Sequence, residues 1–92
     1  MDATTDTSAA PGSEAGLPDP DLELDVKGLD CPLPILRTKL ALSRIDAGQL
    51  LHVIATDPHS VVDFKAFCAR TEHELVHLLQ EDGRFEFYIR RA

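Results

Sequence analysis

The sequence predicts an α/β fold in which two helices cover one face of a four-stranded mixed sheet. Three observations lead to it: an alternating segment over residues 22–27, two segments of helical periodicity, and an Asp-Gly pair between two apolar runs near the C-terminus. Together they give the element order βαβαββ. With two helices and four strands, the simplest packing places both helices on the same side of the sheet.

The first strand is predicted from the alternation of apolar and charged residues over 22–27. Gly28 and Asp30 then interrupt the strand pattern. Helical periodicity follows, and we expect a helix over residues 33–46. It should end before Gly48, because glycine is a common C-terminal stop.

A second strand is expected over residues 50–56, which are apolar on both faces except at His52, as in an interior strand. Asp57 and Pro58 then match an N-cap followed by proline at the first helical position. We expect the second helix to continue to about Arg70.

The last part of the chain is predicted to form a β-hairpin. Residues 75–80 and 85–90 have strand character, and the Asp82-Gly83 pair between them is a strong signal for a tight turn. This hairpin supplies the third and fourth strands of the predicted sheet.

The formal net charge of -7 is unevenly distributed along the chain. Residues 1–21 contain five acidic residues and no Lys or Arg, and they are rich in small and polar residues. We therefore expect a disordered acidic tail over 1–21 and a single domain over 22–92. The domain has 11 acidic and 9 basic residues. This balance disfavours strong direct nucleic-acid binding, which needs a basic surface.

We expect no membrane association, because no segment has the length and apolarity of a membrane span. The N-terminal residues also lack the pattern of a signal peptide, in which a charged region precedes an apolar run.

Two cysteines without an export signal predict free thiols in a reducing cytoplasm.

Cys31 is the leading candidate for chemistry, because the run Cys31-Pro32-Leu33-Pro34 lies at a strand-to-helix junction. A helix N-terminus favours the nucleophilic thiolate. However, the two prolines remove amide donors, and the carboxylate of Asp30 disfavours a second negative charge. We predict an accessible nucleophile without a strongly lowered pKa. The alternative is an incidental surface cysteine in a proline-rich turn.

Cys68 is predicted to be structural, because it shares a helical sector with Phe64 and Phe67 and should pack against the core. A redox pair with Cys31 is not favoured, since one thiol is expected at a helix tip and the other on a core-facing side.

The segment His73-Glu74-Leu75-Val76-His77 matches H-E-x-x-H, a zinc-protease motif that requires a helix. Here the segment precedes the predicted hairpin and has strand character. On a strand, the two imidazoles would lie about 13 Å apart, too far to bind one ion. We interpret the match as coincidental and expect no metal site. His52 and His59 are not spaced from other candidate residues in a way that is typical of a metal or catalytic site.

Helix phase divides the first helix into two sides. The side expected to face the sheet contains Ile35, Thr38, Ala41, Leu42 and Ile45. The outer side carries what we call the leucine stripe, Leu33, Leu36 and Leu40, with Arg37 and Arg44 beside it. Three exposed leucines in a row next to a reactive thiol predict a partner-docking surface. Alternatively, a loop or the tail covers them, or the helix phase is shifted by one residue.

The run over residues 24–39, LDVKGLDCPLPILRTK, resembles the opening of the TusA/SirA-type sulfur carriers, whose C-P-x-P motif it contains. Further matching positions are Gly48, Ala55-Thr56-Asp57-Pro58, Asp63, Phe67-Cys68 and His73-Glu74-Leu75. The resemblance covers residues 22–92. The chain departs from the family pattern at Glu72, where a glycine is usual, and at Leu40, where a polar or basic residue is common.

The resemblance implies an α/β (α+β) two-layer sandwich similar to the C-terminal domain of translation initiation factor three. The strand order would be 1-2-4-3, with one strand antiparallel to the others. The supporting motif around the cysteine would consist of Gly28, Asp30, Pro32 and Pro34.

The resemblance also implies that Cys31 accepts a sulfane sulfur as a persulfide from a cysteine desulfurase or a rhodanese and relays it to an acceptor protein. Family members feed tRNA thiolation, molybdenum-cofactor maturation or sulfur oxidation. We expect a monomeric carrier without a cofactor, rather than a free-standing catalyst. The alternatives are a noncatalytic regulatory or interaction domain of the same fold, and an RNA-binding module.

Overall fold

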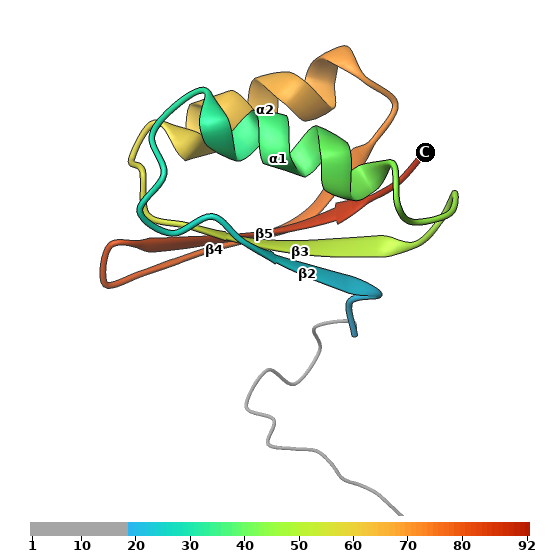
Figure 1. Ribbon diagram of the computed structural model, residues 1–92, viewed down its shortest axis with the longest axis horizontal. Helices are drawn as coiled ribbons and strands as arrows, with labels where there is room; N and C mark the ends of the chain where they lie inside the picture. Colours follow the sequence, from blue (N-terminus) through green and yellow to red (C-terminus); the bar gives the residue numbers. More distant parts are fainter. Residues whose placement is uncertain (1–18) are drawn as a thin grey trace, which may run out of the picture.

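The computed structural model describes residues 19–92, and its elements follow the predicted order (Figure 1). They are β2 (Leu22–Asp25), α1 (Leu33–Leu42), β3 (Leu50–Ala55), α2 (Ser60–Arg70), β4 (Glu74–Glu81) and β5 (Arg84–Arg90). The strands form one four-stranded mixed sheet, and both helices lie on the same side of it (Figure 1). The predicted fold class is confirmed.

The strands are arranged in the order β2-β3-β5-β4. β2 pairs with β3 in parallel, whereas β5 is antiparallel to both β3 and β4. β5 is therefore the one strand that runs against the other three. This is the 1-2-4-3 order that the family resemblance implies, and β3 is an interior strand as predicted.

The hairpin between β4 and β5 turns at Asp82 and Gly83, whose φ angles are 52° and 77°. Positive φ at both central residues is what a two-residue hairpin turn with the right-handed strand twist requires, and it explains the Asp-Gly pair. Within β4, Val76 is an extra residue, because Leu75 pairs with Ile89 and His77 with its neighbour Tyr88.

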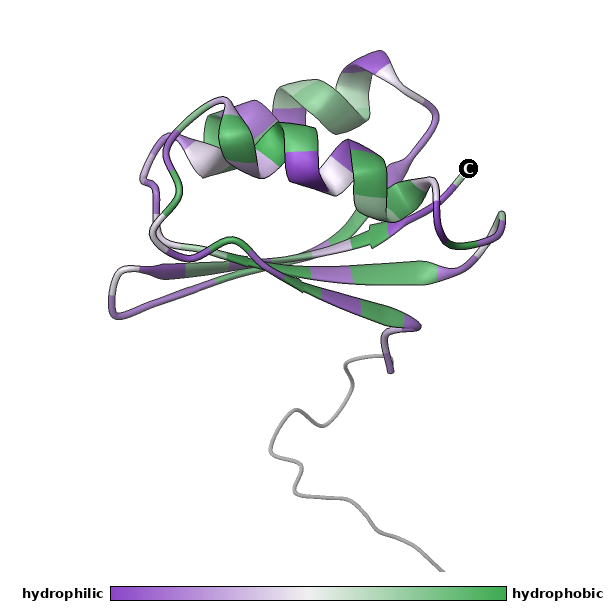
Figure 2. Ribbon diagram, viewed as in Figure 1, coloured by the Kyte–Doolittle hydropathy of each residue, from purple (hydrophilic) through white to green (hydrophobic). Residues whose placement is uncertain are grey.

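The pairing register of the strands aligns apolar side chains in rows that face the helices. One row consists of Leu22, Leu51 and Ile89, and the next of Leu24, Val53 and Phe87. In β2, charged residues alternate with these apolar ones, and the banded colouring in Figure 2 follows this alternation.

The centre of the core is an aromatic contact between the helix layer and the sheet. Phe64 of α2 and Phe87 of β5 are both fully buried, and their rings stack with centroids 4.2 Å apart. From the first helix and the turn after it, the buried residues are Pro34, Thr38, Ala41, Leu42 and Ile45, with Ile35 packed against the core. The predicted sheet-facing side of α1 is confirmed.

The first helix ends at Leu42, four residues before the predicted end at Asp46. The Ser43 hydroxyl donates a hydrogen bond to the Leu40 carbonyl at 2.6 Å. The amides of Arg44 and Ile45 then donate to carbonyls three residues back rather than four. These tighter turns end the α-helix, because the serine side chain competes with the backbone for the terminal carbonyls.

The second helix begins at Ser60, so the predicted N-cap role of Asp57 is wrong. Asp57 forms its own turn ahead of the helix. Its carboxylate accepts a hydrogen bond from the His59 amide at 3.0 Å, and its carbonyl accepts one from the Ser60 amide at 2.9 Å. This turn leaves the second carboxylate oxygen available for another part of the chain.

The predicted tail lies outside the described residues except for its last three. Of these, Asp21 belongs to the sheet, because it exchanges two hydrogen bonds with Leu50. Its amide donates to the Leu50 carbonyl, and the Leu50 amide donates to its carboxylate, both at 2.8 Å.

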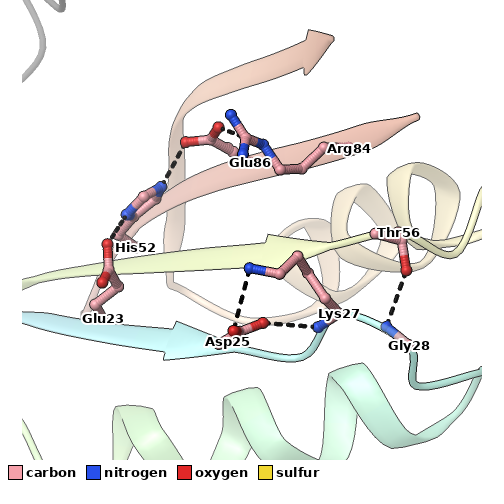
Figure 3. A network of polar contacts seen from close by, with 8 residues as sticks. All are labelled: Glu23, Asp25, Lys27, Gly28, His52, Thr56, Arg84 and Glu86. Atoms are coloured by element: carbon pink, nitrogen blue, oxygen red, sulfur yellow. Dashed lines mark hydrogen bonds and ion pairs between the residues drawn. The ribbon is translucent and has the colours of Figure 1, made fainter. Parts of the chain in front are cut away.

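The helix-free face of the sheet carries a polar network centred on His52 (Figure 3). The Nδ1 atom of His52 lies 2.9 Å from a Glu23 oxygen, and its Nε2 atom lies 2.8 Å from a Glu86 oxygen. The buried ring also stacks on Tyr88, with centroids 4.4 Å apart. A histidine without evident sequence partners thus connects β2, β3 and β5.

Removing the Phe64 ring should destabilise the domain strongly. We expect Phe64→Ala to lower the free energy of unfolding by about 3–5 kcal/mol, because the truncation leaves a cavity beside Phe87. Urea denaturation measures this loss. As the control, Val62→Ala on the same helix removes a side chain that is 68% exposed and should change stability by less than about 0.5 kcal/mol. Equal losses in the two variants would contradict the assignment of Phe64 to the core.

Candidate functional site

The parallel pairing of β2 with β3 brings two loops together at one edge of the sheet. Because both strands run in the same direction, their carboxyl ends lie side by side. The loop over residues 26–32 leads from β2 to α1, and the loop over 56–59 leads from β3 to α2 (Figure 1). Cys31 lies in the first loop and Asp57 in the second.

Hydrogen bonds between side chains of one loop and amides of the other hold the two loops together. The amide of Cys31 donates to the Asp57 carboxylate at 2.9 Å. The amide of Gly28 donates to the Thr56 hydroxyl at 2.9 Å, as Figure 3 shows. Gly28 has a φ of 82°, which is why glycine is favoured there. The position of the cysteine is therefore set by contacts between loops that are distant in sequence.

Cys31 lies just before the N-terminus of α1 and is exposed, as predicted. Pro32 occupies the N-cap position, and the Cys31-Pro32 peptide bond is cis. The Leu33 amide donates to the Asp30 carbonyl at 2.9 Å, and Pro34 is buried within the first turn. The C-P-x-P segment thus forms a stiff turn that presents the thiol to solvent.

Two carboxylates raise the pKa of the thiol. A hydrogen bond to the Asp63 carboxylate is the largest cause that raises the pKa of Cys31, followed by desolvation and by the negative charges of Asp63 and Asp57. The pKa of Asp57 is itself lowered by the amides of His59 and Cys31. The thiol form therefore predominates at neutral pH, despite the position of Cys31 at a helix N-terminus.

The sequence analysis attributed the unfavourable charge to Asp30 and missed both Asp57 and Asp63. Asp57 had been assigned a local capping role, which hid its contact with the cysteine loop. Asp63 lies in the first turn of α2, where its amide donates to the His59 carbonyl at 3.1 Å. The signal that points to Asp57 is its position directly after β3, since the ends of adjacent parallel strands meet at one sheet edge. Asp63 follows in the first turn of the next helix.

The family model described as "Sulfurtransferase TusA" matches residues 22–91 of this chain. The chain belongs to the TusA family. The resemblance found in the C-P-x-P region is thereby confirmed.

Two relatives with the name sulfur carrier protein TusA illustrate the similarity. The protein from Allochromatium vinosum is 54% identical over 72 residues, which cover 78% of this chain and 95% of that protein. The protein from Pseudomonas syringae is 44% identical over 71 residues, covering 77% and 84%. The crystal structure of a SirA-like protein from Desulfitobacterium hafniense superposes with a TM-score of 0.67 at 25% identity, covering 75% of this chain and 95% of that one.

In this TusA-family chain the leucine stripe lies on the outer side of α1, as predicted. Leu33, Leu36 and Leu40 are 43%, 47% and 61% exposed, and Arg37 and Arg44 beside them are exposed as well. The helix phase used in the sequence analysis is therefore correct. The stripe begins two residues after Cys31.

Cys68 is half-buried against the core, and burial raises the pKa of its thiol. Both cysteines are free thiols. Cys68 therefore occupies the core-facing position predicted for it, although it is less completely buried than Phe64.

The H-E-x-x-H segment continues into β4, so the predicted strand conformation is confirmed. Its two histidines have separate surroundings. The Nδ1 atom of His73 accepts a hydrogen bond from the Ala92 amide at 3.0 Å, whereas His77 lies edge-on to Tyr88. Among residues 19–92, no three His, Cys, Asp or Glu side chains are grouped as metal ligands would be.

Neither helix of the described domain is long and apolar enough to cross a membrane.

Cys31 and Cys68 should differ sharply in their reactivity toward iodoacetamide. In the native protein we expect Cys31 to be alkylated much faster, because Cys68 is half-buried. The Cys31 rate should rise about tenfold per pH unit up to the raised pKa, since the thiolate is the nucleophile. Peptide mass spectrometry at successive pH values measures both rates.

Denaturation in urea provides the control, because it should make the two alkylation rates similar. Equal native rates would contradict the difference in burial. A Cys31 rate that is already at its plateau at neutral pH would contradict the raised pKa.

Proposed function

We propose that this TusA-family protein is a sulfur carrier that accepts a sulfane sulfur as a persulfide on Cys31 and relays it to an acceptor protein. The observation that carries the proposal is the exposed thiol of Cys31, held in a rigid turn that docked proteins can reach. The names of the relatives from Allochromatium vinosum and Pseudomonas syringae support a sulfur-carrier role.

The proposed chemistry is two successive sulfur-transfer steps. In the first, the Cys31 sulfur attacks the outer sulfur of a donor persulfide, a new S–S bond forms, and the donor thiolate leaves with the electron pair of the broken S–S bond. In the second, an acceptor thiolate attacks the outer sulfur on Cys31, and Cys31 leaves as the thiolate. Each step exchanges one S–S bond for another, so no external oxidant or reductant is needed.

An open site suits a carrier better than a free-standing catalyst. A persulfide that two proteins must reach in turn needs an accessible terminal sulfur, and the exposed position of Cys31 provides it. We infer a cysteine desulfurase or a rhodanese as the donor and a sulfur-relay protein as the acceptor. A reducing cytoplasm is the compartment that would keep Cys31 and Cys68 as free thiols.

The leucine stripe is the docking surface that we propose for these partners. Its three exposed apolar side chains begin two residues after the thiol and continue along α1, with Arg37 and Arg44 on the same side of the helix. Apolar contacts supply the buried area, and the arginines attract acidic partner surfaces, an effect that salt should weaken.

Replacing Cys31 should abolish sulfur loading without unfolding the domain. After incubation with a cysteine desulfurase and cysteine, we expect the intact mass of the wild-type chain to increase by one sulfur atom that maps to Cys31. Cys31→Ser should show no such increase, while the matched variant Cys68→Ser should be loaded normally. Loading that persists in Cys31→Ser would refute the assignment.

Replacing a leucine of the stripe should weaken docking while leaving the fold intact. Leu36→Gln and Leu40→Gln remove exposed apolar surface at little cost in helix propensity, so the melting temperature should hardly change. The donor concentration that gives half-maximal loading should rise several-fold. Leu79→Gln, at an exposed leucine of β4, serves as the control. If Leu36→Gln or Leu40→Gln unfolds the domain, or neither affects loading, the docking surface lies elsewhere.

A further inference from the structure

His52 is a buried titratable side chain that the thiol site does not use. It belongs to the interior strand β3, on the helix-free face of the sheet, and is 7% exposed. Its Nδ1 atom lies 2.9 Å from a Glu23 oxygen of β2, and its Nε2 atom lies 2.8 Å from a Glu86 oxygen of β5. Figure 3 shows the ring between the two carboxylates, so one side chain connects three neighbouring strands.

Both contacts of the His52 ring call for a proton on the nitrogen. A carboxylate oxygen only accepts hydrogen bonds, and a neutral imidazole carries a single N–H. In the neutral ring, one nitrogen would therefore turn its lone pair toward a carboxylate oxygen, and the two would repel each other. An imidazolium donates from both nitrogens and adds charge attraction to each contact. The geometry thus fits the charged ring and not the neutral one.

The surroundings of the two carboxylates suit charged acceptors. The Glu23 side chain is 63% exposed to water. The second oxygen of Glu86 lies 3.2 Å from Nε of the Arg84 guanidinium, which is always positively charged. Neither carboxylate therefore has to carry the proton that the second ring contact needs.

We propose that His52 is a pH-sensitive clamp on β2. As an imidazolium it binds Glu23 and Glu86 together, and so ties β2 to β5 across β3. After the loss of one ring proton it can donate to one carboxylate only. The contact given up is the one with Glu23, because that carboxylate is open to water, whereas Arg84 also holds Glu86. The clamp is a property of the sheet and does not depend on the proposed sulfur transfer.

The short edge strand β2 is where such a clamp has most effect. β2 has four residues and pairs with β3 alone, whereas β3 and β5 pair over six residues. It leads directly into the loop that carries Cys31. The contact from Glu23 to His52 adds to the few backbone hydrogen bonds that hold this edge. Release of Glu23 would therefore loosen the strand that precedes the thiol loop.

Other charged and titratable groups share this face with the clamp. By strand alternation and register they are Asp25 with Lys27 beside it, Arg84, Tyr88 and Arg90 of β5, and Glu74, His77 and Glu81 of β4. With Glu23 and Glu86 included, the acidic residues outnumber the basic ones, which favours the charged ring. Tyr88 stacks on His52 at 4.4 Å, and His77 lies edge-on to Tyr88 at 6.0 Å. His77 is thus a second titrating group that a test must separate from His52.

The stability that the clamp contributes has a defined pH dependence. It is present while the imidazole is protonated and both carboxylates are ionised. It is lost as the pH rises through the titration of the imidazole, and again as the pH falls through that of the carboxylates.

Nitrogen-15 NMR of the folded, unaltered chain tests the charge on the ring directly. At neutral pH a free histidine is largely neutral, whereas both ring nitrogens of His52 should show the chemical shifts of protonated nitrogens. At higher pH one of them should lose its proton while the fold is retained. A neutral His52 ring at neutral pH would overturn the proposal, whether or not any variant folds.

A double-mutant cycle between Glu23 and His52 then tests the clamp. Urea denaturation of Glu23→Gln, His52→Gln and the double variant is compared at neutral pH and at a higher pH where NMR shows the ring to be neutral. At neutral pH, Glu23→Gln should raise the unfolding equilibrium constant about twofold to fivefold, since water partly screens the contact of an exposed carboxylate. It should have no effect in the His52→Gln chain, and little effect in the wild-type chain at the higher pH. An equal effect at both pH values, or in both chains, would overturn the clamp.

Two further variants separate the contact from its surroundings. Glu81→Gln is the matched control, because it removes the same charge from the same face at the other edge strand, and its effect should be equal at both pH values. A pH-dependent effect of the same size as in Glu23→Gln would assign the result to the net charge of the face and refute the proposal. The cycle should be unchanged in His77→Gln. If its pH dependence disappears there, His77 is the titrating group and the clamp is wrong.

Discussion

The parallel pairing of β2 with β3 is the constraint on which the whole site depends. It directs the loops after both strands to one edge of the sheet, and the Asp57 carboxylate then bonds to the backbone of each loop, at Cys31 and at His59. One side chain therefore fixes the cysteine loop relative to the start of α2, which carries Asp63. An antiparallel pair would send the two loops to opposite edges, and the thiol would lack its carboxylate neighbours.

The same contacts determine the electrostatic state of the thiol. The amides that bond to Asp57 lower its pKa, so this link is complete at neutral pH. It is lost only as the pH falls through that lowered value, below the ordinary carboxyl range. The Asp63 carboxylate, desolvation and the charge retained on Asp57 raise the pKa of Cys31, in that order of size. A thiol of higher pKa is intrinsically more nucleophilic when ionised but is a poorer leaving group. A thiol that accepts sulfur and then releases it, as proposed for Cys31, would have to serve in both capacities.

Features that depend on local sequence pattern could be predicted, and features that depend on distant contacts could not. Alternation identified the first strand, an apolar run the second, and helical periodicity the two helices, while Asp82-Gly83 identified the hairpin turn. The end of α1 was missed because it depends on where the Ser43 hydroxyl bonds. The role of Asp57 was misassigned because its second partner lies 26 residues away. The position of Cys31 was therefore predictable, whereas the groups that control its proton were not.

The geometry of α1 connects docking with chemistry. Leu33 and Leu40 are seven residues apart, so the leucine stripe extends about 10 Å along the helix axis from a point beside Cys31. A partner docked on the stripe as proposed would lie beside the thiol and would exclude water from it. Exclusion of water strengthens every charge interaction at the site, including those with the partner's own charged groups. Donor and acceptor would need the same face of α1 to reach the one thiol, so one must dissociate before the other binds. Alternating occupancy of a single face would let a small carrier visit the two proteins in turn.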